Sequence, residues 1–269
     1  MHELLGALAL PFFQRALFGG ILVAIISSLL GIFVVLRNMS FFSDAIAHFA
    51  FTGIAIGFLL GVDPIVAAAG VSMVLALGIG AVERRGGGVS RDAAIGIFFS
   101  GAAAFGIFVI GLLRGYRADL FGYLFGDILA VSNRDIVFSL ILAGVVGLLL
   151  LAYWRPWLMI TLQRELAEVW GLPVARLDAL YLVVLALTAT MNIKVVGILL
   201  MMGLLVIPPS TAKLLSKTFR GMVALSLLFA VLSVVIGLFL SFVLNTASGA
   251  TIVLVAVLFF VLAYAFGKR

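Results

Sequence analysis

The sequence lacks cysteine and carries very little charge. None of its 269 residues is cysteine, which excludes disulfide bonds and metal sites built from thiolates. Only 10% of the residues are charged and 65% are apolar, whereas a soluble domain carries about 25% charged residues. This much apolar surface cannot be hidden in one globular core and must face lipid. We therefore interpret the chain as an integral membrane protein.

The sequence also lacks a soluble domain and a glycine-rich phosphate loop. Its net charge of +6 comes from Lys and Arg residues scattered between apolar blocks, a pattern typical of loops that set membrane topology rather than of a nucleic-acid site. The first ten residues contain His2 and Glu3 instead of a basic segment, so we expect a retained helix and not a signal peptide. Any energy source is expected on another chain.

Nine segments approach or reach the length of about 20 apolar residues that a membrane span requires. They are residues 14–36, 41–60, 64–82, 93–113, 133–153, 177–193, 195–212, 220–243 and 248–266. Only residues 192–194 separate the sixth segment from the seventh, so eight spans are the alternative. Residues 119–130 are too short and too polar to span, and they predict a re-entrant helix. We expect an all-α, polytopic membrane protein with a single transmembrane domain over residues 1–269.

The distribution of basic residues predicts the orientation. Nine spans place the two termini on opposite sides, and the positive-inside rule chooses between the two arrangements. With the N-terminus outside, the inner loops carry twelve Lys and Arg residues and the outer loops carry five. We therefore expect the N-terminus outside and the C-terminus in the cytoplasm. Within the second span, Gly53 and Gly57 have the spacing that lets two helix backbones approach closely.

The second span contains an acid and a histidine one helical turn apart. Asp44 and His48 are four residues apart, so both project from one helical face. An ionisable group at membrane depth costs about 2.5–3.5 kcal/mol on insertion scales and marks a functional site by default. A carboxylate oxygen and an imidazole nitrogen at this spacing can share one metal ion. The alternative is an Asp–His hydrogen bond that stabilises a helix contact; we favour the metal because the spans contain so few charges.

Two ligands are too few for a tight structural zinc site, which takes four, but they suit an ion that must leave as well as enter. Water, a carbonyl, another helix or a second copy of the chain can supply the rest. Oxygen and nitrogen ligands without sulfur fit zinc, manganese or iron(II), and the ligand type does not choose among them. We expect the metal to be cargo and no cofactor to be bound permanently.

The connection at residues 154–176, which the orientation places in the cytoplasm, contains a short amphipathic helix. Its apolar face consists of Leu162, Leu166, Val169 and Trp170. Gly171 and Pro173 are expected to end it. Such a helix can lie among lipid headgroups or dock onto a partner protein.

Four stretches resemble the permeases of ABC importers for zinc, manganese and iron (the ABC-3 type), and the zinc-uptake permease most of all. They are "RNMSFFSDAIAHFAFTGIAIGFLLGVDP" (37–64), "DLFGYLFGDILAVSNRD" (119–135), "GLLVIPPSTA" (203–212) and "LFLSFVLNTASGATIVL" (238–254). The first two stretches are specific to this family, and the "YLFGD" motif at residues 123–127 favours zinc over manganese members. In this family the Asp and His of "SDAIAH" contact the metal, which implies Asp44 and His48. The spacing Glu165-x-Ala167-x-x-x-Gly171 resembles the helix by which such permeases couple to their ATPase.

The resemblance implies a non-catalytic permease subunit in a bacterial plasma membrane. It also implies two cytoplasmic ATPase subunits, an extracytoplasmic metal-binding delivery protein and a second copy of this chain. Arg114, Arg117 and Arg134 flank the predicted re-entrant segment. They are candidates to meet acidic residues of the delivery protein, and the alternative is that they contact lipid or solvent.

Two other classes of function fit the sequence less well. A secondary metal transporter or channel would need several intramembrane carboxylates and matched halves, but the spans offer essentially one acid, Asp44. An intramembrane zinc protease would need a His-Glu-x-x-His motif, which two histidines so far apart cannot form. A serine protease would need a nucleophile turn beside His48, and the sequence contains none. An ATPase gene beside this one would separate these possibilities.

Overall fold

A computed structural model describes residues 10–85, 90–112 and 131–267, and the regular structure in these ranges is entirely helical. The helices are α2 (Pro11–Leu36), α3 (Ser40–Leu60), α4 (Pro64–Arg85), α5 (Arg91–Leu112), α7 (Asn133–Leu162), α8 (Arg164–Val169), α9 (Val174–Leu215), α10 (Phe219–Leu244) and α11 (Ser248–Phe266). Nine segments within the described ranges are long and apolar enough to cross a membrane. The predicted all-α fold with nine spans is therefore confirmed. The predicted re-entrant helix at 119–130 lies outside the described residues.

Two helices are longer than the sequence pattern predicts. Helix α7 continues past residue 153 to Leu162 and includes Pro156, so the connection predicted at 154–176 is partly helical. Helix α9 joins the sixth and seventh spans because residues 192–194 include neither glycine nor proline and do not interrupt the helix. The break comes instead at Gly197, whose φ of 76° and ψ of 166° are not helical and belong to a region that is essentially restricted to glycine.

The helices form two compact units, which are described separately. Among the described residues, one unit comprises 10–35, 131–145 and 192–267, and the other comprises 36–85, 90–112 and 146–191. The candidate residues Asp44 and His48 and the short helix α8 all belong to the second unit.

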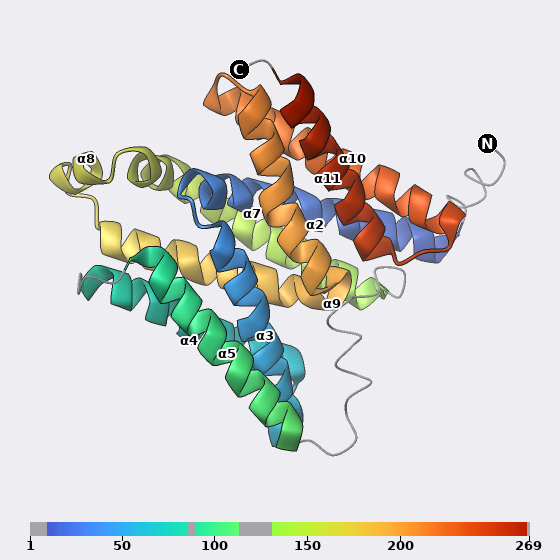
Figure 1. The fold of residues 1–269 in the computed structure, drawn as a ribbon, viewed down its shortest axis with the longest axis horizontal. Coiled ribbons are helices and arrows are strands. Elements are labelled where there is room, and N and C mark those ends of the chain that lie inside the picture. Colours follow the sequence, from blue (N-terminus) through green and yellow to red (C-terminus); the bar gives the residue numbers. More distant parts are fainter. Residues whose placement is uncertain (1–9, 86–89, 113–130, 268–269) are drawn as a thin grey trace. The chain divides into compact units, whose positions relative to one another are not determined.

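In the first unit, aromatic and hydroxyl contacts join helices that are far apart in the sequence. The ring of Phe13 on α2 packs against Phe239 and Phe242 on α10, with centroids 5.0 and 5.5 Å apart. The hydroxyl oxygens of Ser28 and Ser226 lie 2.7 Å apart in a buried hydrogen bond between the same two helices. Helix α11 packs along α10 (Figure 1). The serine hydrogen bond pairs two polar groups that have no water to bind inside a membrane.

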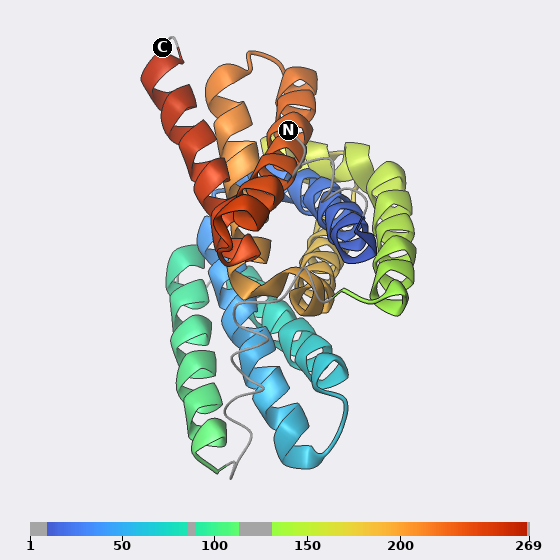
Figure 2. The same ribbon diagram turned by 90° about the vertical axis from the view of Figure 1, so that its right-hand side faces the viewer.

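In the second unit, α3 packs against both α4 and α5, and the three helices run side by side in Figures 1 and 2. Helices α3 and α4 form a hairpin in which the Asp63 carboxylate accepts bonds from the backbone N–H groups of Ile65 and Val66 (2.9 and 3.1 Å). Gly53 faces the backbone of Ala68 so closely that a Cβ atom there would collide with the Ala68 Cα. The predicted close approach of helices at Gly53 is therefore present, and it fixes α3, which carries the candidate site.

We predict that Gly53→Ala forces α3 and α4 apart and destabilises the protein by about 1–3 kcal/mol, the usual cost of overpacking. The matched control is Gly70→Ala on α4, where a Cβ atom would meet nothing within 4 Å. Thermal unfolding in detergent should show a lower midpoint for the first variant only. Equal midpoints for both variants would contradict the close approach.

Candidate functional site

Asp44 and His48 lie one turn apart on α3, and both side chains are partly exposed. The His48 ring makes an edge contact with the Phe99 ring of α5, with centroids 4.5 Å apart and an angle of 72° between the planes. The neighbouring turn is fixed as well, since the Thr52 hydroxyl lies 2.9 Å from the His48 carbonyl and 2.7 Å from the Ala102 carbonyl of α5. The histidine is thus held from one side while its surface remains partly open.

The Asp44 carboxylate differs from that of Asp178 in its partners. Within the part of the chain that the structure describes, no Lys or Arg forms an ion pair with Asp44, whereas Asp178 is paired with Arg37 and Arg164. Over the same residues, no group of three or more His, Cys, Asp or Glu side chains could hold a metal ion. Asp44 and His48 therefore remain a candidate pair, and any further metal ligands would come from outside the described His, Cys, Asp and Glu side chains.

Ser43 adds a neutral oxygen close to this pair. Its side chain is buried, and its hydroxyl has no hydrogen-bond partner among the described residues. Adjacent residues of a helix do not face the same way, so Ser43 projects from a different side of α3 than Asp44 does. It is a buried oxygen donor beside the site and not a third member of the Asp44–His48 face.

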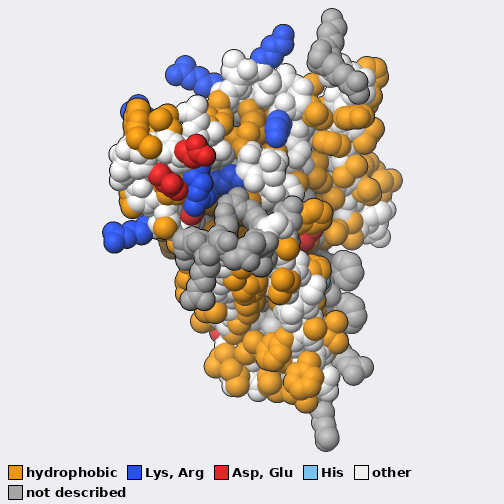
Figure 3. All heavy atoms as spheres, turned by 60° about the vertical axis from the view of Figure 1, so that its left-hand side comes forward, with side chains coloured by type: hydrophobic (Ala, Val, Ile, Leu, Met, Phe, Trp, Pro, Cys, Tyr) orange, Lys and Arg blue, Asp and Glu red, His pale blue; other side chains and the backbone are white. Residues whose placement is uncertain are grey.

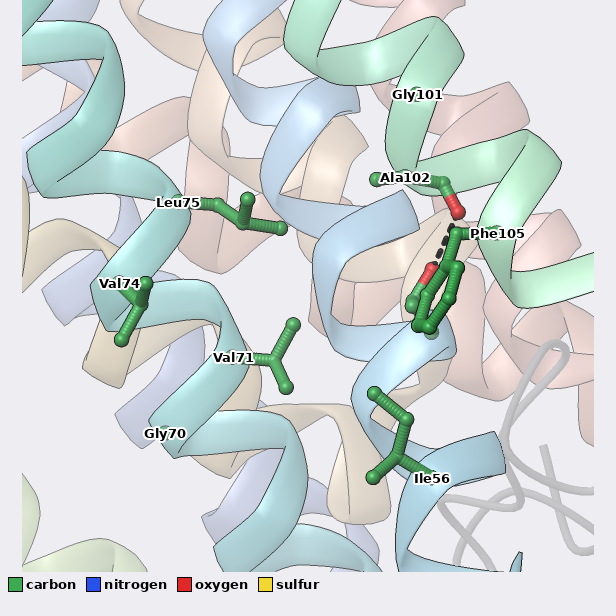
Figure 4. Close-up of a pocket in the computed structure, with 9 residues that line it drawn as sticks. Ile56, Gly70, Val71, Val74, Leu75, Gly101, Ala102 and Phe105 are labelled. Carbon is green, nitrogen blue, oxygen red and sulfur yellow. Dashed lines mark hydrogen bonds between the residues drawn. The ribbon is translucent and has the colours of Figure 1, made fainter. Parts of the chain in front are cut away.

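A hollow of about 370 Å³ lies between α3, α4 and α5, close in sequence to the candidate ligands (Figure 4). It is lined by Thr52, Ile56, Gly70, Val71, Val74, Leu75, Gly101, Ala102 and Phe105. Its hydroxyl, that of Thr52, already donates to backbone carbonyl oxygens. The lining offers a cation neither a carboxylate nor an imidazole, so this hollow is unsuited to a hydrated metal ion.

The short helix α8 presents an uncovered apolar face. The four side chains of the predicted apolar face are all exposed, with Val169 at 82% and Trp170 at 71% exposure, whereas Ala167 is fully buried. The predicted continuous helix is interrupted at Gln163, so Leu162 is the last residue of α7 and only Leu166 and Val169 lie within α8. Glu165 lies on the exposed surface. Gly171 has a φ of 76°, and the bonds from Gly171 N to Glu168 O and from Leu172 N to Ala167 O close the helix in a Schellman motif. The stop predicted at Gly171 is therefore observed.

A cluster of charged residues that the sequence pattern did not single out includes the first residue of α8. Asp178, in the first turns of α9, accepts bonds from Arg37 and Arg164, each 2.9 Å long. Figure 3 shows acidic and basic side chains gathered together at the end of the unit that carries α8, while the lower part of that face is mostly hydrophobic. The sequence signal that could have identified this cluster was Asp178 itself. An acidic residue at the start of an apolar span is expected to have a charged partner.

Of the three arginines expected to meet a delivery protein, Arg134 is exposed in the first turn of α7. Arg114 and Arg117 lie outside the described residues. Their contact with a delivery protein stays a prediction.

Comparison with known proteins covers nearly the whole chain. Residues 9–267 match the ABC 3 transport family. The chain is 36% identical over 262 residues to the manganese transport system membrane protein MntC of Halalkalibacterium halodurans, covering 97% of this chain and 89% of the relative. It is 35% identical over 247 residues to the high-affinity zinc uptake system membrane protein ZnuB of Haemophilus influenzae, covering 92% and 94%. Its fold matches a solved chain of PsaBC from Streptococcus pneumoniae in complex with Fab, with a TM-score of 0.86, 33% identity and coverage of 99% and 96%.

Proposed function

This chain belongs to the ABC 3 transport family, and we propose that it carries a divalent zinc or manganese ion along a path that includes His48 and Asp44. As a member of this family it is the membrane-spanning permease subunit of an ATP-driven metal importer. The subunit itself is not catalytic, and ATP is hydrolysed on a separate ATPase subunit. An extracytoplasmic binding protein is the other partner that an ABC importer requires.

The observation that carries the proposed path is the Asp44 carboxylate within a membrane span. Ser40–Leu60 has the length and hydropathy of a span. Asp44 has no Lys or Arg partner among the described residues, and an unpaired carboxylate within a span is costly. A divalent cation passing through would supply the missing positive charge. His48 supplies a nitrogen ligand one turn away, and imidazole suits both zinc and other transition metals.

The choice between zinc and manganese is a finer proposal. The "YLFGD" wording at 123–127 favours zinc, and one relative is named for zinc uptake. Several other relatives are named for manganese transport. Imidazole favours zinc more strongly than carboxylate does. A large loss of metal binding on removal of His48 would therefore indicate zinc, and a small loss would indicate manganese.

We also propose that α8 is the contact with the ATPase. Its apolar face is exposed, and the spacing Glu165-x-Ala167-x-x-x-Gly171 resembles the coupling helix of importer permeases. A single helix of this kind per chain suits a pair of identical permeases above two ATPase subunits. The proposed assembly is therefore a homodimer in a bacterial plasma membrane, with the N-terminus outside and the C-terminus in the cytoplasm.

We predict that Asp44→Asn, which keeps the shape and removes the charge, lowers metal uptake by about tenfold or more. Losing even an outer hydrogen-bond partner of a metal ligand costs about 10- to 100-fold in affinity. His48→Gln should slow zinc uptake more than manganese uptake if zinc is the cargo. The measurement is uptake of radiolabelled zinc and manganese into membrane vesicles at matched protein levels.

The control for this experiment is Asp63→Asn, on an exposed acid of the α3–α4 turn. Asparagine caps a helix about as well as aspartate, so this variant should transport normally. Wild-type uptake by the double variant Asp44→Asn/His48→Gln would show that the pair is not part of the metal path and serves helix packing instead.

For the ATPase contact, we predict that Glu165→Arg and Gly171→Pro leave the permease inserted but abolish metal-stimulated ATPase activity in the reconstituted complex. The first reverses a charge on the docking surface, and the second places at a φ of 76° a residue that requires about −65°. Arg155→Gln, on an exposed side chain of α7, is the control. Normal stimulation in both test variants would exclude α8 as the contact.

For the delivery protein, we predict that reversing the charges of Arg114, Arg117 and Arg134 slows its association with the permease. The effect should be larger at low salt, because exposed charges are screened as ionic strength rises. Surface plasmon resonance on permease in nanodiscs measures the rate. An association rate that responds to neither mutation nor salt would assign these arginines to lipid or solvent.

A further inference from the structure

We propose that Asp178 is a positioning residue that couples α8 to the segment leading into α3, through ion pairs with Arg164 and Arg37. This inference rests on the proposed role of α8 as the ATPase contact and adds the link by which a movement of α8 would reach the candidate metal ligands.

The two carboxylate oxygens of Asp178 each bond to a different segment of the chain. Oδ1 accepts a bond of 2.9 Å from Arg37, which lies in the turn before α3, and Oδ2 accepts a bond of 2.9 Å from Arg164, the first residue of α8. One carboxylate on α9 thus joins two segments that are remote from each other in the sequence. Charge-assisted bonds of this length are stronger and more directional than neutral ones.

The Arg37 side of the link is fixed by further contacts. Its side chain is only 7% exposed. Nε donates to the Thr161 hydroxyl at 2.8 Å, and the guanidinium lies over the Tyr181 ring at 4.6 Å from the centroid. A guanidinium held by a carboxylate, a hydroxyl and an aromatic face has little freedom, so Arg37 follows any displacement of Asp178.

The Arg164 side is more open. The Arg164 side chain is 42% exposed, and it also lies 3.5 Å from Glu168, one turn along α8. An exposed ion pair contributes little to stability. A stabilising role alone therefore does not explain why Arg164 forms a bond of 2.9 Å to the carboxylate that also holds Arg37. A bond between the exposed helix α8 and a buried anchor is suited to transmitting movement.

The link ends close to the candidate site. Asp44 follows Arg37 by seven residues and lies four residues into α3, about 6 Å from the start of the helix at a rise of 1.5 Å per residue. Because α3 begins at Ser40, a shift of Arg37 is passed to a helix that starts three residues later and carries both Asp44 and His48. A docked ATPase that moves α8 would in this way shift the metal ligands.

The test measures the number of metal ions transported per ATP hydrolysed by the permease–ATPase complex in proteoliposomes. Arg164→Gln and Asp178→Asn should each lower this ratio about fivefold or more, the lower range of typical coupling between two sites. The double variant should be no worse than the more affected single variant, because both changes remove the same bond. Asp178→Glu and Arg164→Lys keep the charges and should recover part of the ratio.

Arg176→Gln is the matched control, an exposed arginine two residues before Asp178, and it should keep the wild-type ratio. Thermal unfolding of Arg164→Gln should match the wild type, since Arg37 and Asp178 remain paired. If Asp178→Asn does not fold, Arg164→Gln alone decides the result. A wild-type ratio in Arg164→Gln, additive losses in the double variant, or an equal loss in Arg176→Gln would overturn the proposal.

The role of α8 as the ATPase contact is tested separately from the link through Asp178. If Glu165→Arg and Gly171→Pro abolish stimulated ATPase activity while Arg164→Gln keeps the wild-type ratio, α8 contacts the ATPase and the link through Asp178 is refuted. If Glu165→Arg and Gly171→Pro keep normal stimulation, the proposed role of α8 fails first.

Discussion

The absence of water inside the bilayer is the constraint on which the rest of this structure depends. Backbone groups must then be paired within the chain, which leaves helices as the available form for a chain of this composition, and the described residues are helical accordingly. The same constraint applies to side chains. The Ser28–Ser226 and Thr190–Ser72 hydrogen bonds pair hydroxyl groups that would otherwise be unsatisfied within the buried interior.

Charged side chains meet this constraint in two different ways in the second unit. Asp178 is neutralised by two arginines, and its side chain is 14% exposed. Asp44 lies within a candidate span and forms no ion pair with Lys or Arg among the described residues. The first carboxylate is satisfied by the protein and is suited to holding elements together. The second has no such basic partner among the described residues, and in the proposed function a divalent cargo would provide the positive charge.

The sequence was sufficient to predict the spans because their signal is local. A run of about 20 apolar residues identifies itself without knowledge of its neighbours, and the second span, predicted at 41–60, matches Ser40–Leu60. The stop at Gly171 was predictable for the same reason, since a left-handed residue after a helix favours glycine. The end of α7 was not, because its continuation from residue 153 to Leu162 requires that Pro156 be accommodated within a helix. The break at Gly197 was also missed, since many glycines of this sequence are compatible with either a helix or a break.

The Asp178 cluster could not be predicted because its members are brought together only by the fold. Arg37 and Asp178 are 141 residues apart in the sequence, and Arg164 and Asp178 are 14 apart. Basic residues near span ends are expected from topology alone, so nothing distinguishes Arg37 or Arg164 from the other basic residues near span ends until the carboxylate between them is located. A pair such as Asp44 and His48 differs in this respect, because a helix places residues four apart on one face whatever surrounds it. Local geometry thus makes the candidate metal ligands readable from the sequence, while the residues that would move them depend on tertiary contacts.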